Sequence, residues 1–183
     1  HERTEVADIL KSEADRMNQV VENYLGAARG RNVEKHTFVL SEVCDSIKEL
    51  IREKAGKGGI QFDISLPEKP VTLNMNMNQL YQILLNLVLN AIDAMPHGGT
   101  IHMQSACSNG LLQIEITDEG TGIPEGKLDK IWETFYTTKK EGTGLGLPIV
   151  KRIVEENNGE IHLESTEGKG TTVELTLPLG GDS

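Results

Sequence analysis

The chain has few aromatic residues and fewer basic than acidic ones. Phe, Trp and Tyr account for 4% of its 183 residues, and 18 Lys and Arg stand against 28 Asp and Glu, giving a net charge of −10. Nucleic acids bind to basic surfaces, and their unpaired bases stack on aromatic side chains. The composition therefore argues against nucleic acid as a partner and predicts a core built from aliphatic side chains.

Cysteines and long apolar runs are also scarce. Only Cys44 and Cys107 are present, in no paired motif, which is typical of buried or idle thiols in a reducing compartment. The longest apolar run, from Ile83 to Met95, is interrupted by two asparagines and an aspartate, so it does not suit a bilayer. No basic and apolar leader opens the chain. We expect a cytoplasmic domain, and a membrane anchor elsewhere in a longer parent protein is compatible with this sequence.

The first 29 residues or so predict one amphipathic helix. Apolar residues recur on a single helical stripe, at Val6, Leu10, Ala14, Met17, Val21, Leu25 and Ala28. An isolated helix of this kind is marginal in water and requires a partner. It either folds back on its own domain or forms one helix of an intermolecular bundle. The length of the stripe and the exit at Gly30 favour the bundle.

The rest of the chain alternates between strand and helix patterns. Helices are predicted at 41–54, 77–95 and 147–158, with Ser41 and Asn76 as N-caps and a short helix near 128–133. Strands are predicted at 36–40, 61–66, 71–74, 100–107, 111–117, 160–164 and 171–177, with an Asn109-Gly110 hairpin turn. This order predicts a two-layer α/β (α+β) sandwich: one mixed, mostly antiparallel sheet with helices on one face, plus the N-terminal bundle helix.

Three polar residues form a second stripe beside the apolar face of the helix at 77–95. They are Asn86, Asn90 and Asp93, spaced four and three residues apart. The apolar face beside them predicts packing on a sheet and consists of Leu80, Ile83, Leu84, Leu87, Ala91 and Ala94. Buried amides are costly unless they bind something. An asparagine carbonyl suits Mg²⁺ that already carries phosphate oxygens. The alternative is that the three polar groups face solvent.

A carboxylate followed by glycines ends the strand at 111–117. Asp118 precedes Gly120 and Gly122, which permit positive φ and close approach of the backbone. A carboxylate held there accepts a hydrogen bond from the exocyclic amine of adenine, whereas guanine presents a carbonyl at that position. The mismatch costs about 1–3 kcal/mol and predicts a preference for ATP over GTP. The alternative is an ordinary Asp-Glu-Gly turn.

A glycine-spaced loop, Gly142–Gly146, leads into the helix at 147–158. Its backbone N–H groups and the start of the helix form an anion site. The loop follows no strand directly, as a dinucleotide-binding fingerprint requires, and it lacks the Gly-Lys-Ser/Thr of a P-loop. The sequence therefore predicts a phosphate site of another class.

Between the two glycine segments lies the stretch Ile131–Lys140, which we call the lid. Trp132, Phe135 and Tyr136 are predicted to anchor it through apolar contacts, while Lys139 or Lys140 reaches a phosphate. The alternative is a surface loop held by its aromatic residues.

Four segments in this order resemble the sequence boxes of a known family. Asn86–Ala91, Asp118–Gly122, Phe135–Lys139 and Gly142–Gly146 are similar to the N, G1, F and G2 boxes of sensor histidine kinases. That family shares its ATP-binding superfamily with gyrase, MutL and the large heat-shock chaperones. The ending Gly168–Pro178 resembles the closing hairpin of the same domain, and the likeness covers residues 36 to 178.

The opening helix also resembles a part of these kinases. Its segment Glu13–Asn18 is similar to the second helix of the dimerisation and phosphoacceptor hairpin. The resemblance implies a partial hairpin helix at 1–30 and an ATP-binding catalytic domain at 31–183.

The resemblance implies a role for each matching residue. Asn90 would bind Mg²⁺, and Asn86 would order the phosphates, so both count as catalytic. Asp118 would read the adenine amine, and Thr171 would reach the base through water. The remaining ATP-binding positions would be Asp93, Gly120, Gly122, Ile123, Tyr136, Lys139, Thr143, Gly144, Leu145, Gly146 and Leu147. Many relatives carry a basic residue where this chain has Asp93, so charge compensation there would fall to the lid lysines.

By the same resemblance the chain is part of an ATP-dependent protein-histidine kinase of two-component signal transduction. It would transfer the γ-phosphoryl of ATP, with Mg²⁺, to a histidine on a hairpin of the same or a partner subunit, for relay to a response regulator aspartate. A homodimer through the N-terminal helix is expected when the full hairpin is present. The alternatives are a same-fold ATPase and a non-catalytic nucleotide-binding or dimerisation module.

The acceptor histidine itself is not identified. The family's motif is a histidine followed by acidic, basic and proline residues; His1-Glu2-Arg3-Thr4 resembles its start, but no proline follows. These residues also stand in the segment that resembles the second hairpin helix. We therefore expect the chain to be incomplete for autophosphorylation.

Overall fold

The chain divides into two compact units, His1–Val33 and Glu34–Ser183. The computed structural model describes residues 35–139 and 142–180, all within the second unit. The predicted N-terminal helix, its dimer contact, the acceptor-like start at His1 and Lys140 lie outside the described residues.

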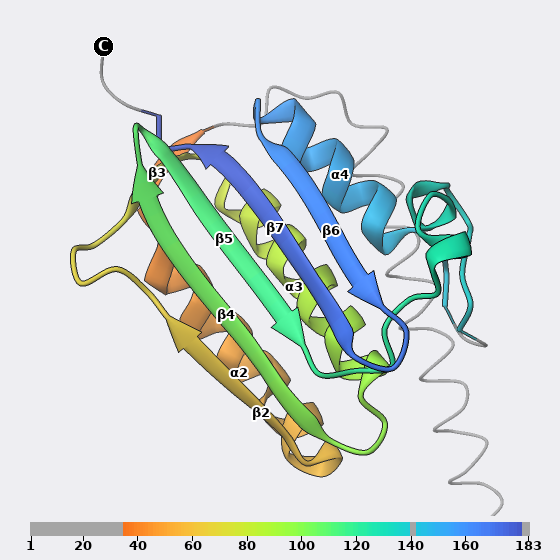
Figure 1. Cartoon of the computed structure of the whole chain (residues 1–183). Helices are drawn as coiled ribbons and strands as arrows, with labels where there is room; N and C mark the ends of the chain where they lie inside the picture. The colour runs from red at the N-terminus through yellow and green to blue at the C-terminus, as the bar shows by residue number, and fades with distance from the viewer. Residues whose placement is uncertain (1–34, 140–141, 181–183) are drawn as a thin grey trace, which may run out of the picture. The chain divides into compact units, whose positions relative to one another are not determined.

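A five-stranded sheet forms one layer of the second unit, and helices cover one of its faces (Figure 1). The strands, in spatial order, are β2 (Ile60–Ser65), β4 (Gly99–Ser108), β5 (Leu111–Asp118), β7 (Gly170–Pro178) and β6 (Glu160–Thr166). β2 and β4 are parallel, and all other neighbours are antiparallel. The helices are α2 (Leu40–Gly58), α3 (Met77–Ala94) and α4 (Gly146–Glu156). The predicted two-layer sandwich with a mixed, mostly antiparallel sheet is confirmed.

The helix α3 lies at the centre of the helix layer, between α2 and α4. It begins where predicted, because the side chain of Asn76 accepts a hydrogen bond from the backbone N–H of Gln79 at 3.2 Å. Its buried residues are Leu80, Ile83, Leu84, Leu87, Val88, Ala91 and Ile92. The predicted apolar face is thus confirmed except at Ala94, which is half-buried.

The prediction of a single sheet is wrong. β1 (His36–Val39) pairs with β3 (Thr72–Met75) in a separate two-stranded antiparallel sheet. The prediction of Ser41 as an N-cap is also wrong, because α2 already begins at Leu40, whose N–H donates to the carbonyl of Val71 at 2.9 Å. The helix then runs past the predicted end to Gly58. Glycine within a helix costs about 1 kcal/mol but does not forbid it.

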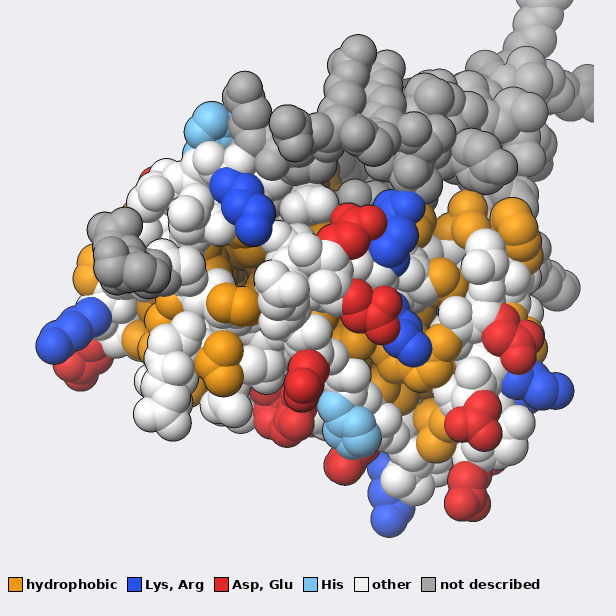
Figure 2. Space-filling model, turned by 90° about the horizontal axis from the view of Figure 1, so that it is seen from above, with side chains coloured by type: hydrophobic (Ala, Val, Ile, Leu, Met, Phe, Trp, Pro, Cys, Tyr) orange, Lys and Arg blue, Asp and Glu red, His pale blue; other side chains and the backbone are white. Residues whose placement is uncertain are grey.

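The two cysteines are free, and they differ in exposure. Cys44 is buried, and this burial, assisted by the charge of Asp45, raises the pKa of its thiol to about 11, so the thiol stays protonated and unreactive. Cys107 is exposed. On the face drawn in Figure 2, Lys and Arg side chains lie among Asp and Glu side chains and do not gather into one basic patch. None of the described helices is both long and apolar enough to cross a membrane.

Candidate functional site

Asp118 is the last residue of β5, and its side chain is buried, with 8% of its surface exposed. Its Oδ1 accepts a hydrogen bond from the backbone N–H of Gly120 at 2.8 Å. Burial raises the pKa of this carboxyl group above its usual value. Hydrogen bonds from the backbone of Gly120 and Thr171 and the charge of Lys139 oppose that rise. The site thus contains an acceptor whose desolvation favours binding of a hydrogen-bond donor.

The two glycines after Asp118 are required by the packing of the chain itself. A Cβ on Gly120 would lie 2.7 Å from the Cβ of Ala94, at the end of α3. Gly122 has φ +63°, and a Cβ there would lie 2.0 Å from the carbonyl oxygen of Thr166. The backbone N–H of Thr121 donates to the carbonyl of Ala94 at 3.0 Å. The turn is therefore held between α3 and the β6–β7 hairpin.

Ser165 on β6 joins two of the predicted site residues, although sequence reasoning missed it. Its Oγ accepts a hydrogen bond from the backbone N–H of Ile123 at 2.8 Å and lies 2.9 Å from the Oγ1 of Thr171. Thr171 in turn stands opposite Asp118 in the β5–β7 register. We call Asp118, Gly120, Gly122, Ile123, Ser165 and Thr171 the base-end cluster.

The amides of α3 lie against the start of α4. A Cβ on Gly146 would lie 3.7 Å from Oδ1 of Asn86 and 3.7 Å from Nδ2 of Asn90. Both asparagines are half-buried, so the alternative of a solvent-facing stripe does not describe them. Within the described part of the chain, the buried Nδ2 of Asn86 has no hydrogen-bond partner. A buried donor left unpaired costs about 1–3 kcal/mol, so this group fits a ligand oxygen.

Lys139 of the lid contacts α3, the helix that carries Asn86 and Asn90. Its Nζ lies 3.0 Å from Oδ1 of Asn90 and 3.0 Å from Oδ2 of Asp93. The expected compensation of Asp93 by a lid lysine is therefore confirmed for Lys139. The carbonyl oxygen of Asn90 faces a cation in this arrangement, which is consistent with a place for Mg²⁺. Among the described residues no group of three or more His, Cys, Asp or Glu is placed to hold a metal. We call Asn86, Asn90, Asp93, Lys139 and Gly146 the amide cluster.

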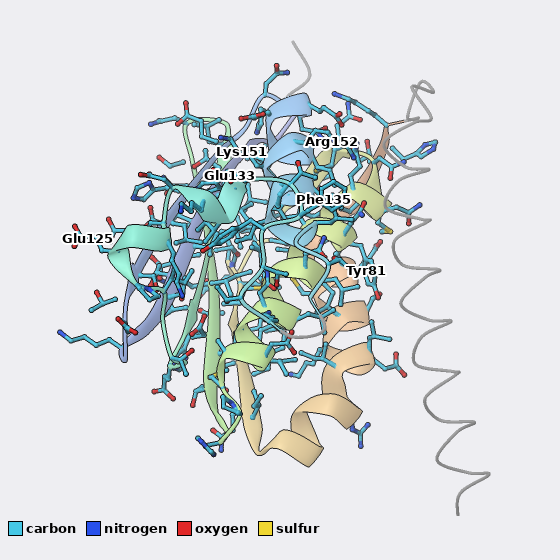
Figure 3. The ribbon with its side chains drawn as sticks, turned by 90° about the vertical axis from the view of Figure 1, so that its right-hand side faces the viewer. Tyr81, Glu125, Glu133, Phe135, Lys151 and Arg152 are labelled. Carbon is cyan, nitrogen blue, oxygen red and sulfur yellow. The ribbon has the colours of Figure 1, made fainter. Side chains whose placement is uncertain are left out.

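The segment that leads into the lid, together with the first lid residues, forms two short turns rather than the single predicted helix near 128–133. They are the 3-10 helices η1 (Glu125–Lys127) and η2 (Lys130–Trp132), and η2 packs against α4. The Nζ of Lys151 on α4 lies 5.7 Å from the centroid of the Trp132 ring, within cation–π range. Figure 3 shows the segment that carries Glu125, Glu133 and Phe135 beside α4.

The prediction that Phe135 anchors the lid is wrong. Its side chain is 68% exposed, and its φ of 70° is unusual for a residue with a side chain. The backbone explains this conformation: the N–H of Phe135 donates to the carbonyl of Gly144 at 3.0 Å, which joins the lid to the glycine loop. A Cβ on Gly144 would lie 2.4 Å from the carbonyl carbon of Phe135. The lid is thus held by its backbone at this point.

The glycine loop ends directly at α4, as expected for an anion site. The residue before α4, Leu145, makes no side-chain hydrogen bond to the first turn of the helix. Within the described residues, the N–H groups of Gly146 and Leu147 therefore have no side-chain cap and are available to a ligand, whereas Pro148 has no N–H. The side chain of Leu145 is buried, with 7% exposed, so only its backbone is available to a phosphate. Tyr136, Thr143, Gly144 and Leu147 are half-buried, and their contacts to a ligand stay predictions.

Comparisons with known proteins agree with this geometry. A family model described as "Histidine kinase-, DNA gyrase B-, and HSP90-like ATPase" matches residues 75–181. The chain is 36% identical over 183 residues to sporulation kinase C of Bacillus subtilis (strain 168), covering 100% of this chain and 43% of that protein. The chain thus spans less than half the length of this relative.

Two solved structures of one histidine kinase have the same fold. The catalytic domain of histidine kinase ThkA, in a nucleotide-free form, matches with a TM-score of 0.73 and 32% identity, covering 80% of this chain and 96% of that one. The structure of ThkA in complex with the response regulator protein TrrA matches with a TM-score of 0.77 and 28% identity, covering 93% of this chain and 49% of that one. The chain therefore belongs to the family of histidine kinase-, DNA gyrase B- and HSP90-like ATPases, and its described part has the fold of a histidine kinase catalytic domain.

Proposed function

We propose that this domain binds ATP with Mg²⁺ and positions the γ-phosphoryl for transfer to a histidine on a separate hairpin helix. The observation that carries the proposal is the buried Nδ2 of Asn86 beside Gly146, at the start of α4, which has no hydrogen-bond partner among the described residues. An amide donor and the first N–H groups of a helix together form a site for phosphate oxygens. The kinase relatives support this assignment.

Each cluster has its own part in the proposal. In the base-end cluster, Asp118 accepts the adenine amine, Thr171 reaches the base through water, and Ile123 lines the pocket. In the amide cluster, Asn86 orders the phosphates and Asn90 offers its carbonyl oxygen to the metal. Tyr136 and the backbone of residues 143–147 complete the nucleotide site. Bound Mg²⁺ supplies neutralisation of phosphate charge.

The transfer requires positioning and charge neutralisation more than a nucleophile within this domain. The acceptor is proposed to lie on the hairpin whose second helix resembles residues 1–30, and the product passes to a response regulator, as the complex of ThkA suggests. The full hairpin would make the protein a homodimer. On α3, a hydrolase of the same fold would use a glutamate as base, whereas the corresponding turn carries Asn86.

The proposal is tested by phosphoryl transfer to an acceptor hairpin added as a separate polypeptide. With labelled ATP and Mg²⁺, the wild-type chain should label the hairpin and leave itself unlabelled. Asn90→Ala should abolish the transfer and remove the gain in ATP affinity that Mg²⁺ gives in calorimetry, because the metal loses its protein ligand. Asn78→Ala is the matched control, since Asn78 is an exposed asparagine on the same helix.

Four outcomes would contradict the proposal. Unchanged Mg²⁺-dependent affinity in Asn90→Ala would remove the metal role. Acid-labile phosphate on His1 would show that the chain phosphorylates itself. Steady release of inorganic phosphate without transfer would favour the ATPase, and nucleotide binding with neither reaction would favour a binding module.

A further inference from the structure

On the side of the sheet that faces the helices, residues of β5, β7 and β6 stand opposite one another and form rows across the three strands. Residues that stand opposite one another on neighbouring strands have their side chains on the same face of the sheet. Two rows are apolar and the row after them is polar. The rows are Ile114, Leu175 and Ile161; then Ile116, Val173 and Leu163; then Asp118, Thr171 and Ser165. The polar row lies at the edge where β5 and β6 end and β7 begins (Figure 1).

Ser165 connects the most elements within that polar row. Its Oγ accepts from the backbone N–H of Ile123 at 2.8 Å, donates to the carbonyl of Gly170 at 2.9 Å and lies 2.9 Å from Oγ1 of Thr171. One hydroxyl thus ties the segment after the Asp118 turn to both strands of the closing hairpin. Its side chain is half-buried, so water competes less for these bonds than at the surface.

The single proton of the Ser165 hydroxyl determines the direction of its hydrogen bonds. A serine hydroxyl has one proton and two lone pairs. The proton goes to the carbonyl of Gly170, and one lone pair accepts the N–H of Ile123. Only a lone pair remains for Thr171, so Thr171 must donate its own proton to Ser165. The oxygen of Thr171 then presents only lone pairs to the rest of the site.

We propose that Ser165 is a positioning residue for base recognition, which holds Thr171 as a hydrogen-bond acceptor beside Asp118. This inference rests on the proposed binding of ATP at the base-end cluster. Adenine presents an amino group that donates to acceptors, either directly or through a water. Guanine presents a carbonyl oxygen at the same position, which two acceptors repel. Ser165 therefore acts on the choice of base through Thr171, without touching the nucleotide.

The test compares valine and threonine at position 165, which have the same shape and differ in the hydroxyl. Calorimetry on the full chain would measure the affinities for Mg·ATP and Mg·GTP. In Ser165→Val the affinity for ATP should fall about three- to tenfold, with a smaller change for GTP, because Thr171 becomes free to turn its proton toward the base. Ser165→Thr should restore the wild-type ratio of the two affinities.

A second hydroxyl pair provides the matched control. Thr117 on β5 and Thr172 on β7 stand opposite each other, one residue along from Asp118 and Thr171, with Oγ1 atoms 3.0 Å apart and side chains on the opposite face. Thr172→Val should leave the ratio unchanged. A double variant of Thr171→Val and Ser165→Val should match Thr171→Val alone, because Ser165 acts through Thr171. Thermal unfolding of every variant identifies those that fail to fold, and Ser165→Ala replaces Ser165→Val in that case.

The outcomes separate this inference from the proposed function. If the wild-type chain binds no ATP, the proposed function fails first. If it binds ATP and the hydroxyl-free variant keeps the wild-type ratio of ATP to GTP affinity, the positioning role of Ser165 is wrong. An equal loss of both affinities would also overturn it, since that is the effect of a merely structural bond.

Discussion

The turn after β5 and the lid both belong to the proposed nucleotide site but are held in place by different means. Gly120 and Gly122 are fixed by backbone and side-chain contacts from α3 and the β6–β7 hairpin, and Asp118 beside them is buried. In the lid, by contrast, most side chains are exposed, including Glu133, Thr134, Phe135, Thr137 and Thr138. The proposed base end is therefore formed by packing, whereas the lid at the proposed phosphate end has mostly exposed side chains.

This difference suits the two tasks. Selecting one base requires donors and acceptors at fixed positions, and close packing holds them there. Enclosing a triphosphate requires a segment that opens and closes, and such segments have few buried contacts. The comparison predicts that substitutions at the base end damage the fold together with binding, while those in the lid change binding with little effect on the fold.

The largest effect is expected from Gly122→Ala. The new Cβ would lie 2.0 Å from the carbonyl oxygen of Thr166, at a φ of +63° that disfavours alanine. We expect a loss of stability of about 2–4 kcal/mol and a fall in ATP affinity of at least about tenfold. Chemical denaturation and calorimetry would measure the two. The matched control is Gly126→Ala, where a Cβ meets no atom within 4 Å. Equal stability of the two variants would contradict the rigid base end.

Much of the base end was predictable from the sequence. Asp-Glu-Gly on its own is a common turn, so the prediction of Asp118, Gly120 and Gly122 as site residues depends on the resemblance of four segments in order to the boxes of sensor histidine kinases. Ser165 was missed for a physical reason. It continues the alternation of Ile161 and Leu163 on β6, but only the register with β7 shows that it stands beside Thr171.

The lid was less predictable, because its arrangement depends on contacts between distant segments. The sequence indicated that a lysine there would compensate Asp93, but the bond to Asn90, 49 residues away, depends on how the chain folds. The sequence also predicted that Phe135 is an anchor, since aromatic side chains are usually buried. Its side chain is exposed, and its backbone is bonded to Gly144, a contact that no local pattern reveals.

The second prediction concerns Asp118→Asn, which removes the buried titrating group of the base-end cluster. Burial raises the pKa of Asp118 in the folded chain above its value in the unfolded chain. The contribution of this group to the free energy of unfolding is therefore greatest below the unfolded pKa, and it is lost as the pH rises through the folded pKa. Asparagine does not titrate. The stability of the variant relative to wild type should therefore increase over that pH range and then level off, as measured by denaturation at a series of pH values.

The affinity of Asp118→Asn for ATP should fall, whereas its stability relative to wild type should rise. With its carbonyl held by the N–H of Gly120, the new amide would turn a donor toward the adenine amine, and ATP affinity should fall by about ten- to a hundredfold. Asp129→Asn, an exposed carboxylate after η1, is the matched control. A variant that lost stability at neutral pH would show that the carboxylate supports the fold, which contradicts its assignment as a costly binding group.

The smallest effect on the fold is expected from Lys139→Met, because the pair with Asp93 has side chains 38% and 40% exposed. Such pairs contribute about 0–1 kcal/mol, so denaturation should hardly change.

The lid should nevertheless respond to the loss of Lys139, because the bonds to Asn90 and Asp93 link it to α3. Amide hydrogen exchange should become faster at residues 137–139, whereas Lys127→Met, an exposed lysine in η1, should leave it unchanged. ATP affinity should fall because a positive charge beside Asn90 and Asp93 is lost, and adding Asp93→Asn should restore part of it by removing a negative charge. If Lys139→Met left exchange in the lid at the wild-type rate, the lid would be held by its backbone alone. The contrast with the base end would then disappear.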